Sequence, residues 1–365
     1  MTLPDGVYLG LPMAEYVADP ALSGSAFYHL LTEPGAIAWN SPANPLWDGG
    51  ESSKGQLRGS AAHSAILEGL AAYEAAYCVA PQGALKTGED MSAWLAKAKA
   101  AREDLAGLKI SGKVGELRAR IEDARRLIAE NDELWPVFYD EKIGGRAVLS
   151  ANDDAFVRIL HRFVHSDVDF RRHLTGGLPE VTIVLTREGV RYKCRIDYMT
   201  AGGDLDLKTY GRPPNLDSSL KRHLVRQAFY NGAHLQAAHN ATMAAHAGAL
   251  LRSGRLEITN MSQAEPPVFV DAVIRLRDIF ALRAARPPVF RWLFLRMDGP
   301  PTGMLIPFRQ SDGMYQKALA DIEHAVTVYQ NYVATCGAGE LWFTSAGEQE
   351  IDDTDWPLGA WEGKS

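Results

Sequence analysis

Cysteine is scarce in this 365-residue chain, and the few cysteines are far apart. Cys78, Cys194 and Cys336 form no Cys-x-x-Cys motif. Three thiols cannot supply the four ligands of an iron–sulfur cluster, so we expect no iron–sulfur cluster. Their number and spacing predict reduced thiols of the kind found inside cells.

The chain also lacks an apolar run long enough to cross a bilayer and an N-terminal pattern typical of a signal peptide. We therefore expect a cytoplasmic location and no membrane association. An excess of basic residues is missing as well, because 38 Lys and Arg stand against 45 Asp and Glu, for a net charge of −7. A protein with this balance can bind nucleic acid only through a local basic patch.

The length is sufficient for one large domain or two modest ones with a sizeable core. No internal repeat and no abrupt change in composition marks a boundary. We predict one domain over residues 1–365, with its core at about 56–250. An N-terminal helical segment is expected over residues 1–55, and C-terminal strands and a helix over residues 265–345 are expected to pack on the core.

The segment from Pro179 to Tyr210 predicts three consecutive strands. Apolar and β-branched residues fill the first, and glycine-containing reversals separate the three. The strands are expected over residues 181–185, 191–199 and 204–209. Strands and helices along the chain together predict an α/β fold, a mixed central β-sheet flanked by helices.

Charged residues gather on one face of the third predicted strand. Alternation places Asp204, Asp206 and Lys208 on that face and leucines on the other. If Asp197 of the preceding strand lies alongside, each pair of carboxylates at ~4 Å costs roughly 4 kcal/mol at an effective dielectric of ~20. A divalent cation removes that cost. The pattern alone also fits an edge strand with a solvated face and an ordinary salt bridge.

Helices are predicted on both sides of these strands. One begins near Arg58 and carries His63, although a lone helical histidine is more often a packing or surface residue. A long helix is expected over residues 218–252. Three of its histidines are His234, His239 and His246, of which His234 and His239 are five residues apart and poorly placed to share a metal ion. Arginines at residues 118, 120, 125 and 126 alternate with acids, which fits a solvated helix face or a phosphate-contacting one.

The C-terminal third predicts further strands and a last helix. The run VFVDAVIRL, residues 268–276, is typical of a strand, and an Arg-rich link follows it as a loop. Paired strands are expected over residues 292–297 and 304–308. An amphipathic helix is expected over residues 313–335.

The order of several residues resembles the PD-(D/E)xK nuclease superfamily, its RecB-like branch, and most closely the nuclease domain of exonuclease VIII (RecE) with its phage-encoded relatives. The stretches YVADPALSGSAFYHLLTEPGA and GSAAHSAILEG resemble the same group. The resemblance covers residues 6–342, except 84–134 and 252–290. The ordered residues are His63, Glu180, Asp197, Asp206, Leu207, Lys208, Gln227 and Tyr230.

The resemblance implies a restriction-endonuclease-like core with a Mg²⁺ or Mn²⁺ site. Asp197 and Asp206 would be the carboxylate ligands, with the backbone carbonyl of Leu207. His63 would be the additional ligand of the RecB-like branch. Glu180 would lie at the edge of the site, where it would hold a metal-bound water or a second ion.

The resemblance also implies roles in catalysis and DNA binding. Lys208 would orient or activate the attacking water and offset charge on the scissile phosphate. Gln227 and Tyr230 would form the glutamine–tyrosine helix motif that borders the site and contacts DNA. The wider pattern has three intervening residues rather than two and, aligned on Tyr230, would put Arg226 in the glutamine's place. The basic residues expected along the phosphate backbone are Arg212, Lys221, Arg222 and Arg226.

We therefore predict a Mg²⁺-dependent exodeoxyribonuclease that acts 5′ to 3′ on linear duplex DNA in phage-type recombination. By the same resemblance we expect DNA, a single-strand annealing protein and further copies of the chain as partners. One alternative is a nuclease for single-stranded or branched DNA. Another is a non-cleaving DNA-binding protein with the same fold, against which the intact Asp197, Asp206 and Lys208 argue.

Overall fold

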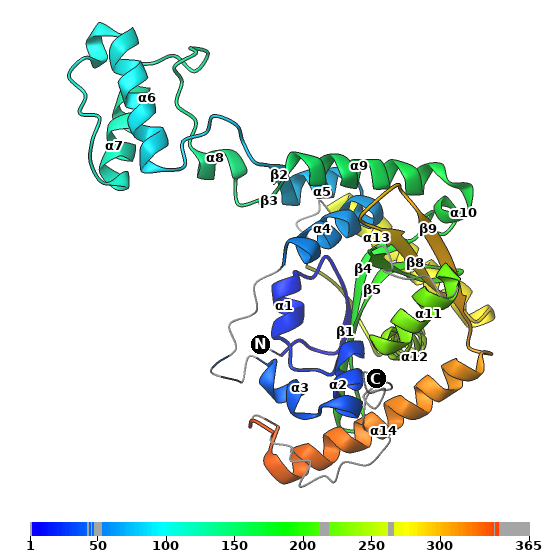
Figure 1. The fold of residues 1–365 in the computed structure, drawn as a ribbon. Coiled ribbons are helices and arrows are strands. Elements are labelled where there is room, and N and C mark those ends of the chain that lie inside the picture. Colours follow the sequence, from blue (N-terminus) through cyan, green and yellow to red (C-terminus); the bar gives the residue numbers. More distant parts are fainter. Residues whose placement is uncertain are drawn as a thin grey trace, which may run out of the picture.

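The computed structural model describes residues 2–41, 44, 46, 53–211, 219–261, 266–338 and 340–342. In these ranges a seven-stranded sheet forms the centre of the molecule, and helices cover both of its faces (Figure 1). The predicted fold class, a mixed central sheet flanked by helices with helical additions, is confirmed. Among the described helices, none has the length and apolar character needed to cross a membrane.

The sheet has the strand order β7-β1-β4-β5-β6-β8-β9. The β1–β7 and β6–β8 pairs are parallel and the other neighbours are antiparallel. The strands predicted within residues 181–209 and 292–308 are confirmed. The bounds are Gly6–Leu9 (β1), Leu178–Arg187 (β4), Val190–Thr200 (β5), Gly203–Tyr210 (β6), Ile258–Asn260 (β7), Phe290–Arg296 (β8) and Gly303–Phe308 (β9), with β2 (Tyr77–Val79) and β3 (Ala147–Leu149) as a separate parallel pair.

Two helical layers enclose the sheet. On one face Leu205 and Leu207 of β6 pack with helices α4, α9 and α10, and on the other the strands pack against α12 and α13. Helices α2 and α14 pack together beside α12. The helix bounds are Met13–Ala18 (α1), Gly24–Thr32 (α2), Gly35–Trp39 (α3), Lys54–His63 (α4), Leu70–Ala76 (α5), Ala151–Ser166 (α9), Val168–Arg171 (α10), Leu220–Tyr230 (α11), Ala233–Arg252 (α12), Pro266–Ala285 (α13) and Gly313–Cys336 (α14).

The strand predicted over residues 268–276 is wrong, as is the loop after it, because both belong to helix α13. Leu276, Ile279, Phe280 and Arg283 are buried at helical spacing, so packing against the sheet selects the helix over the local β propensity. Arg283 donates hydrogen bonds to the Thr200 carbonyl at 2.8 and 2.6 Å. It also forms a buried ion pair of 2.6 Å with Asp204, which fixes the helix to the turn before β6.

The single helix predicted over residues 218–252 is also wrong, because it is interrupted between α11 and α12. Gly232 lies at the break with a φ of 69°, in the left-handed region that glycine favours. A Cβ on Gly232 would lie 2.7 Å from the Tyr28 side chain, so α2 approaches the chain closely at this point. The break allows α12 to pack along the sheet independently of α11.

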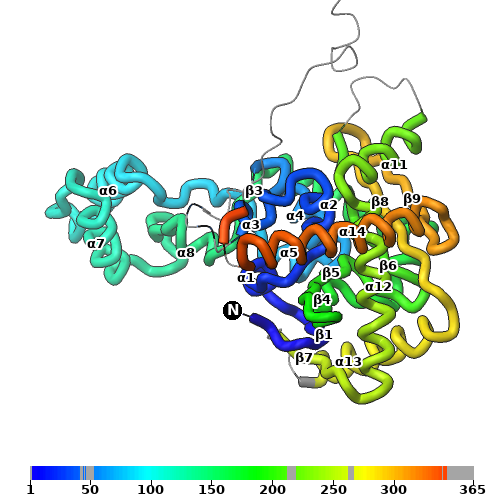
Figure 2. The backbone as a smooth tube through the Cα atoms, turned by 90° about the horizontal axis from the view of Figure 1, so that it is seen from below, coloured from blue at the N-terminus to red at the C-terminus, as the bar shows by residue number. Residues whose placement is uncertain are grey.

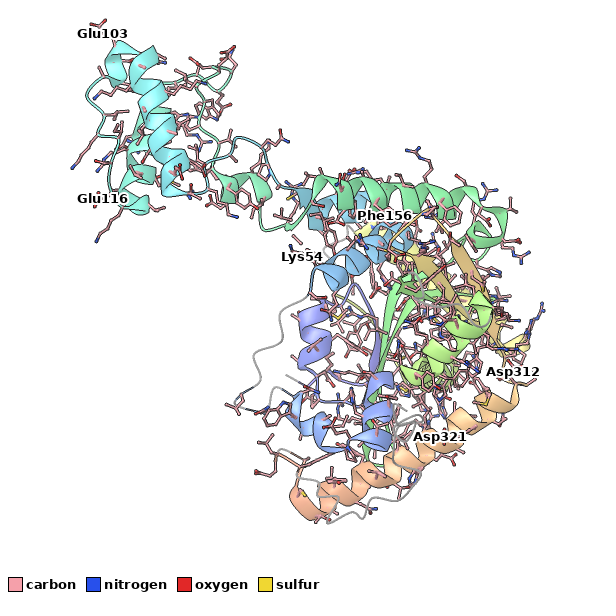
Figure 3. The ribbon with its side chains drawn as sticks, viewed as in Figure 1. Lys54, Glu103, Glu116, Phe156, Asp312 and Asp321 are labelled. Carbon is pink, nitrogen blue, oxygen red and sulfur yellow. The ribbon has the colours of Figure 1, made fainter. Side chains whose placement is uncertain are left out.

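Helices α6 (Gly88–Ala101), α7 (Val114–Arg125) and α8 (Tyr139–Ile143) project from the rest of the molecule, as Figures 1 and 2 both show. A short 3-10 helix, Glu103–Leu105, follows α6, and Figure 3 shows Glu103 and Glu116 far from Phe156 and Asp321 of the main body. Apolar clusters of its own hold the projection together. The predicted division of the chain into core and flanking segments stays a prediction.

The arginines of the projection form ion pairs with nearby acids. Arg118 pairs with Asp140 at 2.9 Å and Arg125 pairs with Glu141 at the same distance. Arg120 pairs with an acid one helical turn earlier, at 3.3 Å, and Arg126 with one three residues earlier, at 3.5 Å. These pairs favour a solvated helix face over a phosphate-contacting one.

Gly203 at the start of β6 provides a test of this architecture. A Cβ at Gly203 would lie 1.8 Å from the Val289 carbonyl oxygen, and its φ is 149°. We expect Gly203→Ala to lower the free energy of unfolding by about 3 kcal/mol in urea denaturation, because backbone atoms must move. Gly202→Ala is the matched control, since its nearest contact would be 3.9 Å away. Equal effects of both substitutions would contradict the close β6–β8 approach.

Candidate metal centre

Three neighbouring strands bring three carboxylates to one level of the sheet. The β4–β5 register places Glu180 opposite Asp197. The β5–β6 register ends at the pair of Tyr198 with Leu205, and one further step places Asp206 opposite Asp197. The like charges that the sequence predicts to converge are therefore register neighbours.

An irregularity in β4 marks the position of Glu180. Its φ is 53°, a left-handed conformation that is uncommon for residues other than glycine. Leu178 and Val181 belong to the same apolar cluster although they are three residues apart, so the alternation of the strand is broken between them. Backbone strain of this kind is often found at functional sites.

The Asp197 carboxylate occupies the place where β5 and β6 separate. Its Oδ2 accepts a hydrogen bond of 3.0 Å from the Leu207 N–H, in place of a strand-to-strand bond. Leu207 thus positions Asp197 through its amide. The metal contact that the resemblance implies for the Leu207 carbonyl stays a prediction.

Helix α4 delivers His63 to these carboxylates. Gly59 and the fully buried Ala62 let the helix lie close to β6, and a single turn of π-helix, Ser64–Glu68, follows His63 directly. Such turns are frequent at functional sites. The His63 Nε2 lies 2.8 Å from Asp197 Oδ2, and its Nδ1 lies 3.3 Å from Glu180 Oε1.

Lys208 and Asp206 form the other half of the cluster. The Lys208 ammonium donates to Asp206 Oδ1 at 3.0 Å and to Gln236 Oε1 of α12 at 3.2 Å. The second Asp206 oxygen, Oδ2, is buried and accepts no well-aligned hydrogen bond, although Lys208 Nζ lies 2.9 Å away. An oxygen of this kind is available to a further cation.

Burial and neighbouring charges shift the pKa values of the cluster. Burial raises the pKa of Glu180 to about 7, and burial followed by the Asp197 charge raises the pKa of Asp206 to about 7. Burial lowers the pKa of His63, but Asp197 and Glu180 outweigh burial and raise it to about 9. Burial works against ionisation of Asp197, yet His63 and Lys208 hold its pKa below the usual value. Burial lowers the pKa of Lys208, while Asp206 and Asp197 give a net increase.

The cluster opens into a cleft of about 980 Å³. His63, Glu180, Asp197 and Leu207 line one side of it. The remaining walls come from the N-terminal segment and from helices α2, α4, α5 and α12. Tyr16, Ser23, Gly24, Ser25, Gln56, Gln236 and Asn240 are among the lining residues.

The donor set fits a divalent cation. One atom each from His63, Glu180 and Asp197 lies within 4.8 Å of the others, as needed for a common ion. Carboxylate oxygens with one imidazole nitrogen suit Mg²⁺ or Mn²⁺. The Asp206 oxygen without a hydrogen bond adds a fourth ligand candidate at the same level of the sheet.

The predicted DNA-binding residues lie away from this cleft. Helix α11 carries Lys221, Arg222, Arg226 and Tyr230 on its exposed surface. Gln227 is half-buried on the same helix, and its Oε1 has no hydrogen-bond partner among the described residues. None of these side chains is among the described residues that line the cleft, and the roles expected for Gln227 and Tyr230 stay predictions. Arg212 lies outside the described residues.

Gln236 and Asn240 of α12 are the cleft residues that sequence reasoning missed. Gln236 contacts Lys208, and Asn240 lines the cleft with only 2% of its surface exposed. The two are separated by three residues, which places them on one face of α12. That spacing, together with the Asn231-Gly232 turn signal before α12, could have identified them.

Comparisons with known proteins give a distant likeness in fold. No protein-family model matches the chain, and no curated protein sequence matches it. The fold is similar to a crystal structure described as "Putative exonuclease" from Eubacterium rectale, with a TM-score of 0.40 and 12% sequence identity. The match covers 97% of this chain and 99% of the other.

The shifted pKa values predict that metal binding strengthens as the pH rises. Protonated His63 stabilises the metal-free fold through its contacts with Asp197 and Glu180. This stabilisation is fully present below pH 6.5 and is lost as the pH rises through about 9. Glu180 and Asp206 also lose their protons as the pH rises, near pH 7. A cation must displace these protons, so we expect Mg²⁺ or Mn²⁺ to raise the melting temperature more at pH 8.5 than at pH 6.

Differential scanning fluorimetry of the wild type and Asp197→Ala checks this expectation. The wild type should show a metal-dependent increase in melting temperature, and the variant should show none. Equal shifts in the two proteins would contradict the assignment of Asp197 as a ligand. A shift that shrinks with rising pH would contradict the proton displacement.

Proposed function

We propose that this chain is a metal-dependent deoxyribonuclease that hydrolyses phosphodiester bonds in the cleft. The observation that carries the proposal is the convergence of His63, Glu180 and Asp197 next to the Asp206–Lys208 pair. An imidazole, three carboxylates and an ammonium gathered at three central strands are the groups that metal-assisted phosphodiester hydrolysis requires. The proposal agrees with the resemblance to the PD-(D/E)xK nucleases.

The metal ligands are proposed to be His63, Asp197, Asp206 and the Leu207 carbonyl. Glu180 lies at the edge of this set, 3.3 Å from the His63 ring and 3.6 Å from Arg195. When bound, Mg²⁺ or Mn²⁺ lowers the pKa of water and offsets negative charge on the phosphate. The protein contributes by holding its carboxylates apart from bulk water at fixed positions.

Lys208 is proposed to contact the scissile phosphate and the attacking water. Its ammonium is fixed between Asp206 and Gln236 at 3.0 and 3.2 Å, so it is oriented before substrate binds. A preorganised cation stabilises charge that develops in the transition state. Gln236 thereby acts as a positioning residue for Lys208.

The finer features of the proposal depend on the resemblance to the RecE group. They are 5′-to-3′ exonuclease action on linear duplex DNA, a setting in phage-type recombination in the cytoplasm, a single-strand annealing partner and assembly into a homo-oligomer. DNA would reach the exposed basic residues of α11 (Lys221, Arg222 and Arg226) outside the cleft. A nuclease for single-stranded or branched DNA stays the alternative.

Cleavage assays test the proposed residues. We expect wild type with Mg²⁺ to degrade end-labelled linear duplex, and Asp206→Ala and Lys208→Ala each to lower the rate on the order of 10²–10³-fold or more. The matched controls are Asp321→Ala and Lys317→Ala, because these residues form an Asp–Lys pair of 2.6 Å on the surface of α14, away from the cleft. Full activity in both site variants would contradict the assignment of the site.

Closed circular duplex and single strands distinguish the kinds of nuclease. An exonuclease for linear duplex requires an end, so we expect circular duplex to remain intact under conditions that degrade the linear form. Cleavage of the closed circle would show that the protein needs no DNA end and would exclude exonuclease action. Faster degradation of single strands than of duplex would favour the alternative substrate.

A further inference from the structure

The N-terminal segment forms one wall of the cleft, and three basic side chains on alternate residues of β5 hold it there. Arg191 donates to the Leu3 carbonyl at 2.6 Å and pairs with Asp19 at 3.1 Å. Arg195 donates to the Leu11 carbonyl at 2.6 Å. We call these residues and Lys193, which lies between them, the β5 basic ladder.

Lys193 is the most buried member of the β5 basic ladder, with 6% of its surface exposed. Its ammonium donates to the Tyr16 carbonyl at 2.6 Å and to the Asp19 carbonyl at 2.5 Å. Burial lowers its pKa to about 8. A buried ammonium directed at two backbone carbonyls fixes α1 to the sheet, although α1 has no buried residue of its own.

Tyr16 of α1 is the residue that the β5 basic ladder positions at the cleft. The Lys193 ammonium and the Arg195 guanidinium both lie over its ring, each 4.7 Å from the ring centre. Two cations over the ring restrict its orientation. Tyr16 lines the cleft together with Glu180 and Asp197.

The Tyr16 hydroxyl has no hydrogen-bond partner in the described ranges, although Lys193 and Arg195 both contact its ring. Arg195 connects it to the metal centre, because the same guanidinium lies 3.6 Å from Glu180. Burial, with further effects of Glu180 and Asp197, raises the pKa of Tyr16, so the phenol stays protonated and can donate. A rigid donor without a partner, beside a cation site, is complementary to an anionic oxygen of a ligand.

We propose that the Tyr16 hydroxyl contacts substrate by donating a hydrogen bond to a non-bridging oxygen of the phosphodiester held at the metal centre. This inference rests on the proposed nuclease function. Tyr16 would share the phosphate with Lys208 of β6, so donors from α1 and from the sheet would fix its orientation. Arg195 and Lys193 are positioning residues for this contact.

Tyr16→Phe tests the proposal, because it keeps the ring and both cation contacts and removes only the hydroxyl. We expect this variant to degrade linear duplex about 10- to 100-fold more slowly, with the loss mainly in kcat. Its melting temperature and its metal-dependent thermal shift should equal those of wild type. Tyr28→Phe is the matched control, since Tyr28 packs in the core next to α12 and does not line the cleft.

A phosphorothioate substitution adds a measurement that a structural role would not affect. Sulfur is placed at either non-bridging position of the cleaved linkage, and the two diastereomers are compared in wild type and Tyr16→Phe. We expect one diastereomer to slow wild type more than it slows the variant, because the variant has already lost the contact with that oxygen.

Each other outcome has a distinct meaning. Equal rates and equal phosphorothioate effects in wild type and Tyr16→Phe would overturn the inference and leave the proposed function intact. A slower variant with an equally lowered melting temperature would assign Tyr16 a structural role and overturn the inference as well. An inactive wild type would overturn the proposed function, and the inference with it.

Discussion

The organisation of the cleft depends on electrostatic repulsion between carboxylates that the sheet register forces together. Glu180, Asp197 and Asp206 occupy one level of three neighbouring strands, where burial makes each unpaired charge costly. His63 and Lys208 balance them in the structure, and each comes with an element that is placed to deliver it. The close approach of α4 and the left-handed backbone at Glu180 follow from the same requirement.

The central strands could be predicted from the sequence because their signals are local. Apolar alternation and glycine reversals mark β4, β5 and β6 without reference to other segments. Helix α13 could not be predicted in this way, because its apolar run fits both the 3.6-residue period of a helix and the two-residue period of a strand. Only burial of Arg283 against Asp204 and of neighbouring apolar residues selects the helix. The break at Gly232 has a local signal, which the helical pattern on both sides obscured.

In the candidate site, too, some residues have local sequence signals and others are placed only by the tertiary fold. The acidic strand residues and Lys208 lie close together in the chain, and the structure places them beside His63, which a resemblance rather than a spacing connected to them. Whether they act as assigned stays a prediction. Gln236 lies beside Lys208 only because α12 changes direction after α11. The place of Tyr16 depends on contacts with residues about 180 positions away in sequence, such as the one from Lys193 (177 positions), and no local pattern encodes them.

The pairing of strand β1 determines when the cleft can form during protein synthesis. This strand pairs with β4 near Val184 and with β7 near Ile258, so its partners are translated long after it. At about 5–20 residues per second, the delay is on the order of tens of seconds. The wall that the N-terminal segment forms therefore stays incomplete until β4, β5 and β7 have been synthesised. A chain that stops before Lys193 lacks the contacts that hold α1, so the cleft requires a chain that extends beyond β5.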